Sequence, residues 1–107
     1  MMDHLKEGLH GLIDLELTVA KREHGDTFHS AHEGYGVIRE EMDEANTEHK
    51  LASNYFDDLM YYIRTNDQRM RLQLLRELKE HAMLAACEYT QVAAMAQKMM
   101  ESEEGWT

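Results

Sequence analysis

Apolar residues recur along most of the chain at the spacing of an α-helix, and this pattern predicts four helices. The first is expected over residues 2–22, the second over 30–49, the third over 51–64 and the fourth over 68–101. The expected buried stripe of the first helix is formed by Leu5, Leu9, Leu12, Val19 and Ala20, and that of the second by Tyr35, Ile38, Met42 and Ala45.

Local signals mark where these helices begin and end. Gly25 is expected to cap the first helix at its C-terminus. Ser30 and Glu33 have the spacing of a capping box, in which the serine hydroxyl accepts a hydrogen bond from the Glu33 amide. Phe28 precedes this box and is expected to pack on the first turn. Residues 65–67, Thr-Asn-Asp, predict a turn before the last helix.

The composition agrees with an all-α protein. The chain has no Pro and only 6 Gly, it is rich in helix-forming residues, and no segment alternates as a strand would. With 107 residues it is expected to form one domain, 1–107, whose acidic tail 101–107 frays. Such a core is thin for a monomer, and the nine Met residues suit helix interfaces, so a homodimer or homotetramer is expected.

The charge excludes several partners. A formal net charge of -10 disfavours nucleic acid and a polybasic membrane contact, and no apolar run predicts a membrane helix. A phosphate-bearing small substrate remains compatible if metal ions neutralise it. The residues before Leu17 are too charged for a signal peptide. The single Cys87 has no partner for an internal disulfide and is expected to be a buried thiol, which favours a cytoplasmic protein.

Carboxylates interrupt this apolar pattern. Glu88 lies in the apolar stripe of the last helix, where an uncompensated charge is costly. Glu41 and Glu44 are three residues apart, as are Glu88 and Gln91, so each pair lies on neighbouring turns of a helix. Antiparallel packing would bring the two pairs together as a divalent metal site. Residues 40–44 taken alone also fit a solvated acidic face, but that reading does not explain Glu88.

Two segments carry a family resemblance. Residues 30–44 resemble the first motif of the MazG-like all-α nucleoside triphosphate pyrophosphohydrolases, E-E-x-x-E, matched by Glu40, Glu41 and Glu44. Residues 88–96 are similar to the second motif, E-x-x-D followed by a small apolar run. The resemblance implies a four-helix MazG-like bundle completed by oligomerisation. It also implies cleavage of a nucleoside triphosphate to monophosphate and pyrophosphate.

The resemblance also implies roles for individual residues. Glu41, Glu44, Glu88 and Gln91 would hold Mg²⁺, with Mn²⁺ as a substitute, and Glu40 would orient or deprotonate the attacking water. Gln91 stands where the family has Asp, and its neutral amide should lower metal affinity. The gap between the motifs also looks longer than is usual in the family. The third expected helix, which lies in this gap, would either line a base pocket or form dimer core.

The sequence identifies the basic residues that would bind the substrate phosphates less clearly than it identifies the metal ligands. Lys21 and Arg22, at the end of the first helix, are the best-placed candidates, and His81 lies about two turns before Glu88. Their rivals are Arg64, Arg69 and Arg71. The alternative to an enzyme is a catalytically degenerate helical homo-oligomer with a structural or interaction role, which the substitution at Gln91 would support.

Overall fold

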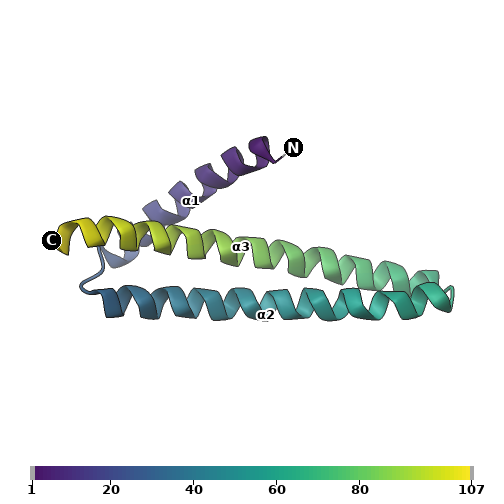
Figure 1. Ribbon diagram of the computed structural model, residues 1–107. Helices are drawn as coiled ribbons and strands as arrows, with labels where there is room; N and C mark the ends of the chain where they lie inside the picture. Colours follow the sequence, from purple (N-terminus) through teal and green to yellow (C-terminus); the bar gives the residue numbers. More distant parts are fainter. Residues whose placement is uncertain (1, 107) are drawn as a thin grey trace. The chain divides into compact units, whose positions relative to one another are not determined.

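The computed structural model describes residues 2–106, which form three α-helices (Figure 1). These are α1 (Asp3–His24), α2 (Ala31–Arg64) and α3 (Gln68–Trp106). No strand occurs among the described residues, which confirms the all-α class.

The expectation of four separate helices is wrong, because residues 31–64 form one continuous helix. No Gly or Pro lies between Gly36 and Arg64 to interrupt it. A partly or fully buried stripe also continues through the expected break at the spacing of a helix. This stripe consists of Ala45, Glu48, Ala52, Tyr55, Leu59 and Tyr62.

The last helix is also longer than expected. α3 continues to Trp106, so the tail that was expected to fray is helical up to that residue, and Thr107 lies outside the described residues. Ser102 explains part of this order, because its side chain is buried and its hydroxyl accepts a hydrogen bond from the Phe28 amide at 2.9 Å. The same hydroxyl donates to the Lys98 carbonyl at 2.8 Å.

Three predicted signals at helix ends agree with the structure. The Ser30 hydroxyl accepts a hydrogen bond from the Glu33 amide at 3.2 Å, as one arm of the expected capping box. Gly25 has a φ of 92° and donates its N–H to the Lys21 carbonyl, as expected of a C-terminal cap. Asp67 accepts from the Met70 amide at 3.1 Å and so caps the first turn of α3.

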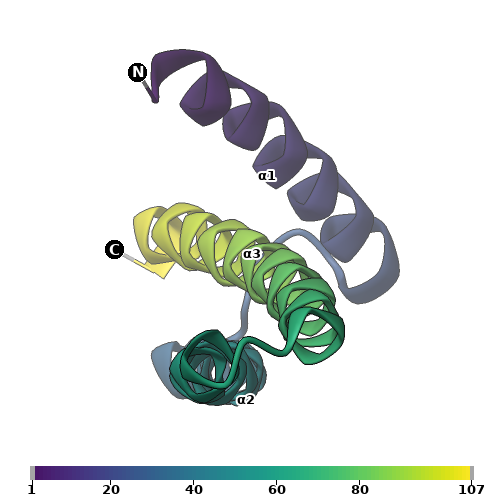
Figure 2. The same cartoon turned by 90° about the vertical axis from the view of Figure 1, so that its right-hand side faces the viewer.

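The chain divides into two compact units, and the second spans residues 43–87. It is a helical hairpin in which the end of α2 and the start of α3 run antiparallel; Figure 2 shows the connecting turn in front. Asn66 adopts the left-handed conformation in this turn, with a φ of 52°. Across the hairpin, the rings of Tyr55 and His81 stack with centroids 5.4 Å apart.

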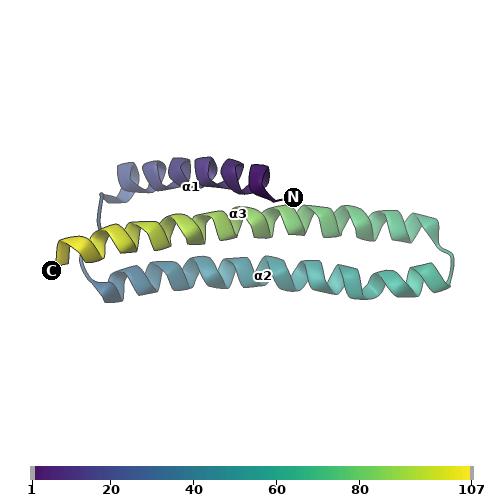
Figure 3. The same cartoon turned by 45° about the horizontal axis from the view of Figure 1, so that its top comes forward.

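The first unit combines the chain up to Met42 with the chain from Glu88 onward. It contains α1, the first turns of α2 and the last turns of α3 (Figure 3). Phe28, in the connection between α1 and α2, is 3% exposed. A Cβ on Gly34 would lie 3.1 Å from the Phe28 ring and 3.0 Å from the Met99 sulfur, so glycine permits this close packing.

Much of the expected core is exposed in the single chain. Leu5 and Leu12 are each 52% exposed and Tyr35 is 62% exposed, although all three were expected to be buried. Cys87 is exposed, which corrects the prediction of a buried thiol. Within residues 2–106, no helix has a stretch both long and apolar enough to cross a membrane.

Candidate metal and ligand site

Three of the predicted site residues meet in the first unit. Glu41 on α2 and Glu88 on α3 each offer a carboxylate oxygen, and these two oxygens lie within 4.8 Å of each other. Gln91 is one helical turn after Glu88. With its amide nitrogen turned toward the carboxylates, Gln91 donates to Glu41 Oε2 at 2.9 Å and to Glu88 Oε2 at 3.2 Å. The two motif segments therefore place their polar groups together.

Glu44 lies one turn after Glu41 on α2, at the start of the second unit. Glu44 is exposed, whereas Glu41 and Glu88 are half-buried. Carboxylate and amide oxygens are the ligands that Mg²⁺ prefers, so the donor set fits this ion. The assignment of these residues as metal ligands remains a prediction.

A cavity of about 580 Å³ lies in the first unit beside this cluster. Its volume falls within the range of small-molecule sites. Glu41 and Gln91 contribute to its wall, as does Glu40, the predicted partner of the attacking water. The remaining carboxylates of the wall belong to Glu16, Glu23 and Glu33. Glu16 is a charge within the apolar stripe of α1, and the cavity accounts for its half-buried position.

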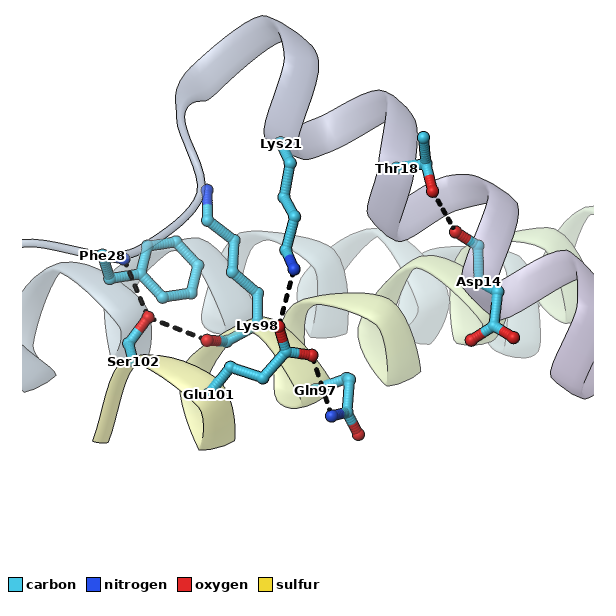
Figure 4. Close-up of polar contacts among 8 residues, drawn as sticks. All are labelled: Asp14, Thr18, Lys21, Phe28, Gln97, Lys98, Glu101 and Ser102. Carbon is cyan, nitrogen blue, oxygen red and sulfur yellow. Dashed lines mark hydrogen bonds and ion pairs between the residues drawn. The ribbon is translucent and has the colours of Figure 1, made fainter. Parts of the chain in front are cut away.

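Lys98 is a further residue of the cavity wall, and sequence reasoning missed it. It is 2% exposed, and its Nζ lies 4.5 Å from the centroid of the Phe28 ring. In Figure 4 its side chain extends from α3 toward the connection between α1 and α2. The signal was present in the sequence, because Gln91, Ala94, Met95 and Lys98 follow one another at the spacing of one helix face.

The basic residues of α1 that were predicted to bind substrate phosphates lie outside the cavity wall. Lys21 forms an ion pair with Glu101 at 2.6 Å (Figure 4). The hydrogen bonds from Lys21 and Gln97 hold the pKa of Glu101 below its usual value. Arg22 is exposed at the end of α1. Neither Lys21 nor Arg22 belongs to the residues that line the cavity.

His81, the third candidate for substrate binding, lies in the second unit. Its Nδ1 is 2.7 Å from Glu48 Oε2, and its Nε2 is 3.6 Å from Glu77. The hydrogen bond to Glu48 raises the pKa of His81 above its usual value of 6.5, against the opposing effect of burial. Glu48 thus accounts for the half-buried position of this histidine.

Fold and site together define an all-α protein whose first unit has an acidic, ligand-sized cavity with one buried lysine in its wall. Comparisons with protein-family models, with curated proteins and with solved structures found no match to this chain.

Proposed function

We propose that this protein is a magnesium-dependent nucleotide pyrophosphohydrolase that converts a ribo- or deoxyribonucleoside triphosphate to its monophosphate and pyrophosphate. The resemblance of residues 30–44 and 88–96 to the MazG-like motifs supports this proposal. The observation that carries it is the meeting of Glu41, Glu88 and Gln91, from both motif segments, beside a cavity large enough for a nucleotide.

In this proposal, Glu41, Glu44 and Glu88 would hold the metal ion, and the Gln91 amide would turn its oxygen toward the ion to complete the set. Mg²⁺, or Mn²⁺ in its place, would supply charge neutralisation for the phosphates when bound. Glu40 is exposed in the cavity wall, where it can orient the attacking water and accept its proton. Water attacks the α-phosphorus, the bond from that atom to the bridging oxygen breaks, and pyrophosphate leaves.

The test is pyrophosphate release from a panel of ribo- and deoxyribonucleoside triphosphates, with and without Mg²⁺. Glu88→Gln should abolish the metal-dependent release, since it removes a charged ligand. Glu103→Gln is the matched control, because Glu103 is an exposed carboxylate near the end of the same helix. Circular dichroism should show unchanged helix content in both variants. Normal turnover by Glu88→Gln would refute the metal assignment, and no release by folded wild-type protein would refute the enzyme.

A second candidate function is a catalytically degenerate homo-oligomer with a structural or interaction role. It is favoured by Gln91, because the amide hydrogen bonds to Glu41 and Glu88 stabilise the two carboxylates without any metal. Turnover that appears only in Gln91→Asp would identify a degenerate enzyme. A stable oligomer with no turnover in either form would identify the interaction protein.

Self-association forms part of both candidates, and a homodimer or homotetramer is proposed. Large apolar side chains that are at least half exposed support it, since burying them in an interface would remove them from water. They include Leu5, Leu12, Leu15, Phe56, Met60, Ile63 and Met83. Light scattering should give at least a dimer mass, and a monomer at micromolar concentration would contradict this. A cytoplasmic location is proposed because the single cysteine is free and exposed, and free thiols persist in a reducing compartment.

A further inference from the structure

The buried ammonium group of Lys98 is unexplained by the fold. Its side chain is 2% exposed, and among residues 2–106 it forms no ion pair. Its Nζ lies 4.5 Å from the centroid of the Phe28 ring. Burying a charge without an ion pair is unfavourable, and a ligand that accepts a hydrogen bond from the ammonium group would compensate this cost. Because Lys98 forms part of the cavity wall, a ligand in the cavity can reach it.

The position of Lys98 shows which part of a ligand it meets. It follows Gln91 by seven residues, which is two helical turns or about 10.5 Å along α3. Its Nζ also lies against Phe28, which precedes α2, whereas Glu41 lies three turns into that helix. Lys98 and the cluster residues Glu41 and Gln91 therefore lie at different positions along the cavity wall. Lys98 faces the part of the ligand that lies away from the cluster.

The surroundings favour a neutral group there. Glu16, Glu23 and Glu33 share the cavity wall with Lys98, so a second phosphate group would be repelled by several carboxylates. A nucleobase is neutral and has both kinds of hydrogen-bonding group. Its carbonyl oxygen can accept a hydrogen bond from Lys98, while its N–H groups can donate to carboxylates.

We propose that Lys98 determines base specificity by donating a hydrogen bond to a carbonyl oxygen of the nucleobase. The enzyme should therefore prefer triphosphates whose base carries a carbonyl group over those of adenine, which has none. This inference rests on the proposed function and names its substrate class.

The sharpest test compares dITP with dATP in the wild-type protein, because the hypoxanthine base has a carbonyl and an N–H where adenine has an amino group and a ring nitrogen. We expect kcat/KM to be at least about tenfold higher for dITP, since a site built around a hydrogen bond discriminates against the analogue that lacks it. Lys98→Met should remove most of this preference, mainly by raising KM for dITP. Lys50→Met is the matched control at an exposed lysine and should leave the preference unchanged.

The outcomes separate this inference from the proposed function. Equal turnover of dITP and dATP by wild-type protein would leave the pyrophosphohydrolase in place and overturn the role of Lys98, even if Lys98→Met fails to fold. An equal loss for both substrates in folded Lys98→Met would show a phosphate contact or a structural role instead. A matching loss of binding for inorganic tripolyphosphate with Mg²⁺ would identify the phosphate contact. No turnover of any triphosphate would overturn both proposals.

Discussion

Replacing Gln91 by aspartate should make the stability of the protein depend on divalent metal. With its nitrogen turned toward the carboxylates, the Gln91 amide donates hydrogen bonds to Glu41 at 2.9 Å and to Glu88 at 3.2 Å, and an aspartate can donate neither. A hydrogen bond to a charged group contributes about 1.5–3 kcal/mol when buried. A like charge at about 4 Å costs about 1 kcal/mol in water. Because the cluster is half-buried, we expect the metal-free variant to lose about 2–4 kcal/mol of unfolding free energy.

Magnesium should reverse this loss. The variant has one more negative charge in the cluster, so it should bind Mg²⁺ more tightly than wild type. A ligand at a hundred times its Kd stabilises the folded state by about 2.7 kcal/mol. The assay is urea unfolding followed by circular dichroism, with and without millimolar Mg²⁺.

Gln97→Asp is the control, because Gln97 donates a similar hydrogen bond to Glu101 at 2.9 Å on the same helix. This control should lose stability that Mg²⁺ does not restore. If metal-free Gln91→Asp is as stable as wild type, the hydrogen-bonded cluster does not exist in solution. If Mg²⁺ restores no more stability to it than to Gln97→Asp, the cluster is not a metal site.

Two further predictions concern stability. Gly34→Ala should lower the unfolding free energy by about 1 kcal/mol, because the new Cβ would lie 3.0 Å from the Met99 sulfur and overpacking outweighs the gain in helix propensity. Gly36→Ala, with nothing within 4 Å of its Cβ, should raise it by about 0.5–1 kcal/mol in the same urea unfolding experiment, and the opposite order would contradict the packing. The hydrogen bond to Glu48 raises the pKa of His81, so its contribution to stability should be complete below pH 6.5 and be lost as pH rises through the higher folded-state pKa. Melting temperatures across this window should fall with pH in wild type and less so in Glu48→Gln, and identical profiles would show that the pair does not form.

The helix ends could be predicted from sequence because their signals are local. Ser30, Gly25 and Asp67 each act on a backbone group within a few residues, and each does so in the structure. The division of residues 31–64 into two helices was wrong because it was made without such a local signal. No local signal at His49 or Lys50 ends a helix, and the predicted break had no glycine or proline to support it.

Burial was harder to predict, because it depends on which elements cover a stripe. Leu5 and Leu12 have the spacing of a buried helix face, yet the single chain leaves them half exposed. Periodicity shows that a helix has an apolar face but not that another part of the same chain covers it. A face predicted from periodicity can instead become an interface between subunits, which is the proposal made for these residues.

The same limit of periodicity explains why sequence predicted Glu88 but missed Lys98 in the cavity wall. Glu88 was found from sequence because a carboxylate in an apolar stripe needs compensation, and the same reasoning applies to Lys98 ten residues later. Lys98 was missed because a lysine can extend its aliphatic stem along apolar surface and place its charge in water, whereas a carboxylate has too short a stem to do so. Its ammonium is held inside by the connection between α1 and α2, which brings Phe28 against it. That contact joins residues seventy positions apart, so no spacing rule along one helix can reveal it. A buried lysine in such a stripe is therefore evidence for a ligand only once the structure shows that no carboxylate pairs with it.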